Sequence, residues 1–120
     1  MQGVRGAITV ENNDKNEVFA AGQQLLLAML ENNQIETQDI GAALFSATDD
    51  ITAVFPAAAA RRLEGWEFVP LFDARQMDVD NSLEKCIRVL LLVNTEKTQR
   101  EIHHVYLGQA ACLRPDLTNK

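Results

Sequence analysis

The feature that most constrains the fold is an apolar run of strand length, Cys86-Ile87-Arg88-Val89-Leu90-Leu91-Leu92-Val93, with one arginine inside it. A continuous apolar run rich in branched residues predicts a β-strand that is buried on both faces. The guanidinium group of Arg88 stays charged, and burying an unpaired charge is costly. Arg88 therefore needs a carboxylate partner, a place at the wet end of the strand, or a pocket that receives an anion. A structural salt bridge is the ordinary role of an arginine in a strand.

The chain has 120 residues, a length typical of one domain, and a formal net charge of −6. This acidic balance argues against non-specific binding to nucleic acid or to an anionic membrane. The N-terminus shows no secretory signal pattern, and no apolar run approaches a membrane span, so we expect a cytoplasmic protein. Cys86 and Cys112 lie in apolar segments, which indicates small buried side chains rather than a disulfide or a zinc site.

The first part of the chain predicts a strand, a long helix and a second strand. Val4–Val10 alternates and is β-branched, which favours a strand. Asp14 and Glu17 have the spacing of a helix capping box, and the helix should run to about Leu30. Ile40–Thr48 predicts the second strand, although its small residues are also compatible with a helix. The helix face that packs on the core is predicted by apolar residues at helical spacing: Val18, Gly22, Leu25, Leu26, Met29 and Leu30.

The second part predicts a short helix and three more strands. Phe55–Gly65 combines an early proline, several alanines and a final glycine, which favours a short helix. Trp66–Leu71 predicts a strand, and Phe72–Ser82 predicts a polar loop. After the Arg88 strand, Thr95–Glu101 predicts a charged loop. The last strand is predicted to begin at His103 and to continue through Leu113.

The pattern indicates an α+β domain that spans residues 1–116, followed by a flexible tail at residues 117–120. One long helix covers only one face of a sheet of this size, whereas the Arg88 strand is predicted to be buried on both. A second copy of the chain is the simplest cover for the other face. We therefore predict an obligate homo-oligomer with functional residues at the subunit boundaries.

Familiar nucleophile and phosphate-binding motifs are absent from the sequence, and neither cysteine has an evident histidine partner. His103 and His104 are adjacent, so in a strand they point to opposite faces and cannot hold one metal ion; both are interpreted as surface or satisfied strand residues. Four arginines lie at the edges of apolar elements, near Phe55 and Tyr106: Arg5, Arg61, Arg88 and Arg114. Arginine suits bidentate recognition of carboxylates, so these residues form either a site for a small dianion or separate surface charges.

Several short stretches carry a more specific signal. They are Val4–Ala7, Phe45–Thr48, Ala53–Ala57, Gly65–Trp66, Met77–Val79, Lys85–Val89, His104–Leu107 and Leu113–Leu117. In this order and spacing they resemble the trimeric, barrel-forming class of chorismate mutase, from Val4 to Asp116. The resemblance implies an isomerase that converts chorismate to prephenate on the route to phenylalanine and tyrosine, without a cofactor or a metal ion.

The resemblance also implies the architecture and the site. Each subunit would hold a mixed five-stranded sheet with one long and one short helix, and three subunits would form a pseudo-α/β-barrel homotrimer with active sites between adjacent subunits. Arg88 would donate to the ether oxygen and to a carboxylate of chorismate. Arg5 and Tyr106 would bind a carboxylate, and Arg61 would support the outer part of the site. The residues around the ring would be Phe55, Ala57, Leu71 and Leu113, with Arg114 closing the site.

Three positions depart from the family pattern. Gln76 replaces a glutamate that faces the substrate hydroxyl and the central arginine, and Asp73 replaces a cysteine at the hydroxyl. We hypothesise that the carboxylate has moved, so that Asp73 accepts from the hydroxyl and orients Arg88 while Gln76 hydrogen-bonds as a neutral group. Ala58 replaces a lysine near the entrance. Arg75 and Arg62 either compensate for that lysine or remain solvated surface charges.

Two other classes of protein are compatible with these residues. A non-catalytic trimeric carboxylate-binding protein would keep the fold and the pocket, and Gln76 is the best argument for it. Another trimeric enzyme with a cleft between subunits, for example an imine deaminase-like protein, is the third possibility. The set formed by Arg5, Arg88 and Tyr106 favours the mutase.

Overall fold

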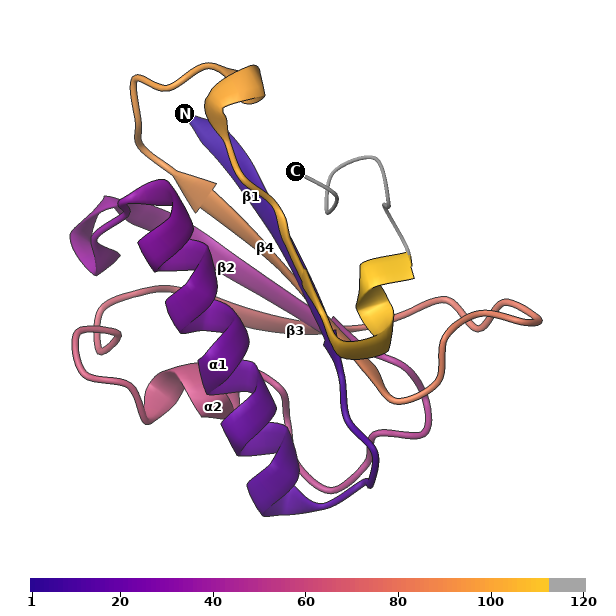
Figure 1. Cartoon of the computed structure of the whole chain (residues 1–120). Coiled ribbons are helices and arrows are strands. Elements are labelled where there is room, and N and C mark those ends of the chain that lie inside the picture. Colours follow the sequence, from indigo (N-terminus) through magenta and orange to yellow (C-terminus); the bar gives the residue numbers. More distant parts are fainter. Residues whose placement is uncertain (113–120) are drawn as a thin grey trace.

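The computed structural model describes residues 1–112 of the chain (Figure 1). The strands form one sheet in the order β3-β2-β4-β1-β5. Strand β4 pairs antiparallel with β1 and β2, while β5 on β1 and β3 on β2 are parallel, so the sheet is mixed, as predicted. The elements are β1 (Gln2–Thr9), α1 (Lys15–Asn33), β2 (Ile40–Ala47), α2 (Ala58–Arg61), β3 (Leu71–Arg75), β4 (Cys86–Val93) and β5 (Val105–Leu107), with 3-10 helices at Thr37–Asp39, Gln99–Glu101 and Gly108–Cys112.

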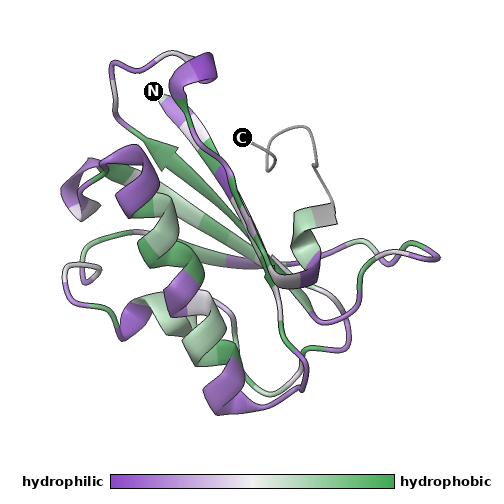
Figure 2. Cartoon of the chain, viewed as in Figure 1, coloured by the Kyte–Doolittle hydropathy of each residue, from purple (hydrophilic) through white to green (hydrophobic). Residues whose placement is uncertain are grey.

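Helix α1 lies across one face of the sheet, with α2 beside it (Figure 1). The predicted apolar stripe of α1 is confirmed, because Val18, Leu25, Leu26 and Met29 are fully buried. Both ends of α1 are hydrophilic and much of its middle is hydrophobic (Figure 2), and Leu27 in this middle part is 53% exposed. Close packing of α1 on α2 requires Gly22, since a Cβ there would lie 2.7 Å from the Cβ of Ala59. None of the helices within residues 1–112 is long and apolar enough to cross a membrane.

The start of α1 is held by side chains that accept from main-chain N–H groups. Asp14 caps the helix by accepting from the N–H of Glu17 at 3.0 Å, as predicted. The Glu17 carboxylate reaches further back than a capping box requires and accepts from the N–H groups of Asn12 and Glu11. These hydrogen bonds to the charged form lower the pKa of Glu17.

Strand β4 is buried on only one face within a single chain. Ile87, Val89 and Leu91 are at most 3% exposed and face α1, whereas Arg88 and Leu90 are half-buried on the other face. One chain thus leaves the second face of the strand uncovered, and its predicted burial by another copy of the chain stays a prediction. The face that carries Arg88 and Leu90 is part of a largely apolar sheet surface. No element of residues 1–112 covers this surface along its length, and it is called the open face below.

The predicted strand at Trp66–Leu71 is wrong. Residues 66–70 form turns, with the N–H of Val69 donating to the Trp66 carbonyl at 3.2 Å. Pro70 has no N–H to contribute to a ladder, although its carbonyl accepts from Ala43. The strand begins only after this proline, so β3 takes up Asp73 and Arg75, which were predicted to lie in a loop.

The last strand also ends earlier than predicted. Strand β5 stops at Leu107, and the chain turns at Gly108, whose φ of +61° favours glycine. A 3-10 helix follows in place of the predicted continuation through Leu113. The predicted short helix is likewise reduced to Ala58–Arg61, flanked by turns. Leu113, Arg114 and the predicted tail lie outside the described residues.

Candidate active site

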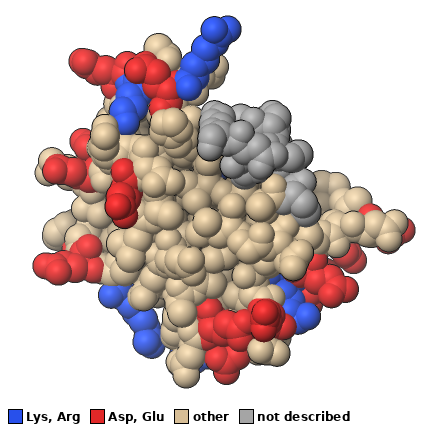
Figure 3. Space-filling model, viewed as in Figure 1, with Lys and Arg blue, Asp and Glu red and all other residues tan. Residues whose placement is uncertain are grey.

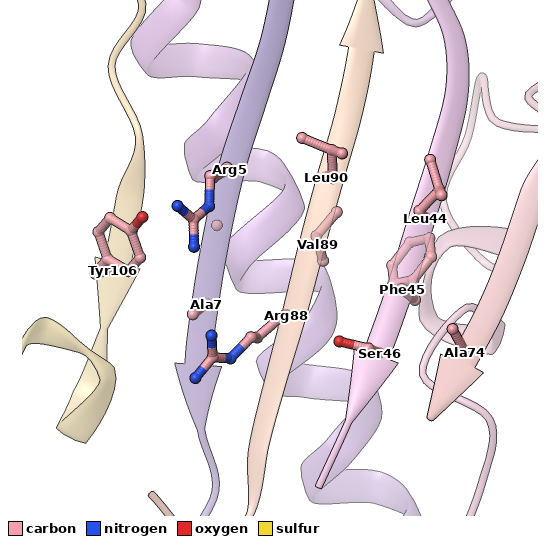
Figure 4. Close-up of a pocket in the computed structure, with 11 residues that line it drawn as sticks. Arg5, Ala7, Leu44, Phe45, Ser46, Ala74, Arg88, Val89, Leu90 and Tyr106 are labelled. Carbon is pink, nitrogen blue, oxygen red and sulfur yellow. The ribbon is translucent and has the colours of Figure 1, made fainter. Parts of the chain in front are cut away.

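Three predicted site residues come together on the open face. In the sheet register Ala7 is paired with both Arg88 and Tyr106, and Arg5 lies two residues from Ala7 on β1. Because side chains alternate along a strand, Arg5, Arg88 and Tyr106 share one face. Figure 4 shows their side chains on three neighbouring strands, on the side of the sheet away from α1. The strand order brings these residues together from distant parts of the sequence.

These side chains line a cavity of about 210 Å³. Its wall is completed by apolar and small residues, among them Leu44, Ser46, Ala74 and Leu90 (Figure 4). Two guanidinium groups therefore meet in a cavity whose described wall carries no acidic side chain. The chain as a whole is acidic, and in the view of Figure 3 most acidic side chains lie around the edge of the molecule. The cavity is a local positive site in an acidic protein.

Polar atoms in this region are buried without a partner. Nε of Arg88, the hydroxyl of Tyr106 and Oε1 of Gln76 make no hydrogen bond with the residues that the structure describes. Within residues 1–112, no carboxylate forms an ion pair with Arg88. The structural salt bridge considered for this arginine is therefore not found there. Buried polar groups that lack partners are costly, so they mark a place where a ligand can supply the hydrogen bonds.

Gln76 follows β3 directly, and its N–H donates to the Ala47 carbonyl at 3.2 Å. It lines a separate cavity of about 300 Å³ together with residues 77–84. Its amide is neutral, so it cannot balance the charge of Arg88. The structure places it beside the loop rather than in the wall of the arginine cavity.

Asp73 lies on the other side of the sheet from Arg88. It is paired with Phe45, which is paired in turn with Val89, and all three belong to the α1 side. Its Oδ1 accepts from the N–H of Ala57 at 2.9 Å. Within one chain the sheet separates the Asp73 and Arg88 side chains, so the predicted contact between them stays a prediction for residues of adjacent copies.

Asp73 instead belongs to a second group of predicted site residues. It lines a cavity of about 780 Å³ with Phe55 and Pro56, and the Phe55 ring is 68% exposed. Arg61 is exposed at the end of α2, and Leu71 is half-buried where β3 begins. Ala57 is fully buried in the core, so its side chain is not available to contact a substrate ring in one chain.

The two arginines considered as substitutes for the entrance lysine are engaged elsewhere. Arg75 binds Asp49 through two hydrogen bonds of 2.7 and 2.9 Å. This pairing lowers the pKa of Asp49 and raises the pKa of Arg75. The guanidinium of Arg62 lies 4.0 Å from the centroid of the Phe19 ring, a cation–π contact. Neither arginine replaces the missing lysine in this arrangement.

One residue beside the arginine cavity was not predicted to have a role there. Nδ1 of His104 accepts from the main-chain N–H of Arg5 at 2.9 Å. His104 stands two residues before Tyr106 and directly before the start of β5. The two-residue spacing between His104 and Tyr106 was the sequence signal that could have indicated a role for His104 near the cavity. The partner of its imidazole, 99 residues earlier in the chain, was not predictable from spacing.

The fold and the site define an α+β protein with an arginine-lined cavity on a sheet face that no element of residues 1–112 covers along its length. Within residues 1–112, no group of three or more His, Cys, Asp or Glu side chains is arranged to hold a metal ion. The cavity offers two guanidinium groups and a phenol hydroxyl. Such groups bind carboxylates and stabilise developing negative charge.

Comparisons with known proteins identify the family. The family model for chorismate mutase type I matches residues 1–117. The chain is 45% identical to chorismate mutase AroH of Bacillus subtilis over 98% of its length and 93% of the relative, and 47% identical to chorismate mutase AroH of Thermus thermophilus over 98% and 96%. A solved chorismate mutase from Clostridium thermocellum superposes with a TM-score of 0.90 at 45% identity, covering 93% of this chain and 99% of that one. The chain belongs to the type I chorismate mutase family, whose members are isomerases.

Proposed function

We propose that this protein catalyses the Claisen rearrangement of chorismate to prephenate in the biosynthesis of phenylalanine and tyrosine. One observation carries the proposal: Arg88 and Tyr106 present buried polar atoms without described partners to a cavity that also contains Arg5. Chorismate is a dianion with an ether oxygen, so it can supply the acceptors that these donors lack. Membership of the family supports the same reaction.

The chemistry requires little of the protein beyond binding and charge. In the rearrangement a carbon–oxygen bond breaks as a carbon–carbon bond forms, with no proton transfer and no covalent enzyme intermediate. The catalyst holds the substrate in a compact conformation and stabilises partial negative charge on the ether oxygen. In our proposal Arg88 donates to that oxygen and to a carboxylate, while Arg5 and Tyr106 hold a carboxylate. The apolar wall strengthens these interactions because it lowers the local dielectric constant.

We propose that three copies assemble and that adjacent copies complete each site. The open face carries the arginine cavity, and Phe72 on the edge strand β3 is 62% exposed. Phe55 and Asp73 line a different cavity from Arg88 in one chain, so a neighbouring copy would have to bring them to the substrate, together with Arg61 and Leu71. Leu113 would pack around the substrate ring and Arg114 would close the site, as the resemblance implies. The cytoplasmic location remains a prediction.

In this assembly, the hypothesis that the site carboxylate has moved from position 76 to position 73 assigns a specific contact to each residue. Asp73 would meet the substrate hydroxyl and Arg88 of a neighbouring copy. Its Oδ1 is already bonded to Ala57, so Oδ2 would be the atom that accepts from the hydroxyl. Gln76 would contribute a neutral hydrogen bond through its buried Oε1.

The test is turnover of chorismate by the purified full chain. Loss of chorismate absorbance is followed continuously, and the product is then treated with acid, which converts prephenate to phenylpyruvate. Absorbance loss with phenylpyruvate formation is the expected result. Chorismate binding without turnover would indicate the carboxylate-binding protein instead, and turnover of imines without chorismate loss would indicate a deaminase-like enzyme.

A further inference from the structure

We infer that His104 is a positioning residue for the anion site, an inference that rests on the proposed function. Its imidazole Nδ1 accepts from the main-chain N–H of Arg5 at 2.9 Å. A nitrogen that accepts a hydrogen bond carries no proton, so the imidazole is neutral in this arrangement. His104 thus joins the strand of one cavity arginine to the segment that leads into Tyr106.

The position of the bond explains why a side chain is needed. The parallel pairing of β1 with β5 starts at Gly6 and Val105, immediately after Arg5 and His104. Strand β5 has only three residues and forms one edge of the sheet, so few main-chain bonds fix its register. The imidazole adds one bond to the start of this short ladder.

A second anchor holds the same segment from the helix side. The buried Asn33 at the end of α1 accepts from the N–H of His103 at 2.7 Å and donates to the His103 carbonyl at 2.8 Å. Asn33 therefore fixes the segment to α1, and His104 fixes it to β1. Tyr106 follows two residues later, so the two anchors set where its hydroxyl meets the cavity that Arg5 also lines.

The experiment compares His104→Leu, which removes the acceptor, with His104→Asn, whose Oδ1 can take the place of Nδ1. We expect His104→Leu to raise KM for chorismate by about 2- to 12-fold, the equivalent of one net hydrogen bond, with kcat changed less than KM. His104→Asn should return KM to within about twofold of the unmodified protein. His103→Leu is the matched control, since the His103 side chain is exposed and its main-chain contacts with Asn33 remain.

Hydrogen exchange of the Arg5 amide, followed by NMR, gives a readout that does not depend on turnover. Exchange should be faster in His104→Leu and restored in His104→Asn. If the unmodified protein does not turn over chorismate, the proposed function fails, and the exchange rates still decide the inference. The inference would be overturned if His104→Leu changed neither KM for chorismate nor the exchange rate of the Arg5 amide. It would also be overturned if His104→Asn restored neither quantity relative to His104→Leu. If His104→Leu does not fold, His104→Ala takes its place.

Discussion

At the scale of single residues, Arg88 holds a charge that no carboxylate within residues 1–112 neutralises. Its Nε is buried without a described partner, and Arg5 and Tyr106 line the same cavity. The sequence alone left a salt bridge, a solvated strand end and an anion pocket open for this arginine. The sheet register favours the anion pocket, because it places Arg88 and Arg5 on the open face and Asp73 on the other side.

Asp73 has one observed role, its hydrogen bond with Ala57, and one proposed role at the substrate, and substitution can separate the two. Asp73→Asn keeps an oxygen for the N–H of Ala57 and removes the charge, so kcat/KM should fall at least about tenfold while the folded state is largely retained. Asp73→Ala removes both roles and should also destabilise the protein by about 1.5–3 kcal/mol, because a hydrogen bond to a charged group is lost. Steady-state kinetics and urea unfolding measure the two effects.

The matched control for Asp73→Asn is the double variant that also carries Gln76→Glu. Adding Gln76→Glu to Asp73→Asn returns a carboxylate to the site and should recover part of the lost turnover. Full activity of Asp73→Asn by itself would exclude a role for the Asp73 charge and leave only its bond to Ala57.

At the scale of secondary-structure elements, the start of α1 is one place where pH should act on stability. Hydrogen bonds from the N–H groups of Asn12 and Glu11 lower the pKa of Glu17 below its usual value of 4.5. A lowered folded-state pKa contributes stability that is fully present above the unfolded-state value and is lost as pH falls through the folded-state value. The contribution is therefore present at neutral pH.

Glu17→Gln should destabilise the protein at pH 7, and the difference from the unmodified protein should shrink as pH falls below 4.5. Urea unfolding at several pH values measures both quantities. Glu31→Gln is the control, because Glu31 is an exposed carboxylate in the same helix. If the difference in free energy of unfolding between Glu17→Gln and the unmodified protein stayed constant across this pH range, the stabilising role given to the Glu17 carboxylate would be contradicted.

The elements differ in how far sequence patterns predict them. Helix α1, β1, β2 and β4 were predictable because their periodicity and capping residues agree with the final packing. Strand β3 was missed because Pro70 interrupts the preceding apolar segment and moves the start of pairing to Leu71. Gly108 ends β5 through a positive φ that spacing alone does not reveal. The family resemblance predicted which residues belong to the site. The face on which Asp73 lies and the contact between His104 and Arg5 became evident only from the strand pairing and the hydrogen bonds of the structure.

At the scale of the whole molecule, we expect copies of the chain to assemble, because no element of residues 1–112 covers the open face along its length. Sedimentation should give a mass of about three times the 13.3 kDa chain. Phe72→Asp places a charge on the exposed edge strand of that face and should yield smaller species with little turnover. Phe68→Asp is the control, because Phe68 is 97% exposed and lies outside the strands. A monomer that turns over chorismate at full rate would contradict the shared site.

Charge at the molecular scale should affect binding of a dianion. The chain carries a net charge of −6, and the resemblance implies that Ala58 stands where the family often has a lysine. We expect a higher KM than in lysine-bearing relatives and a strong dependence of KM on ionic strength, because salt screens the attraction of the arginines. Ala58→Lys should lower KM at low salt. A KM that is the same at low and high salt would contradict this expectation.

The most direct test of the account is kcat for Arg88→Lys relative to the unmodified protein, with circular dichroism confirming that both are folded. Lysine keeps the positive charge but lacks the Nε donor that the structure leaves without a described partner. The account predicts that kcat falls by about 10²–10³-fold, the effect of losing a preorganised donor at the developing negative charge. A variant that keeps kcat within about tenfold would contradict the role assigned to Arg88.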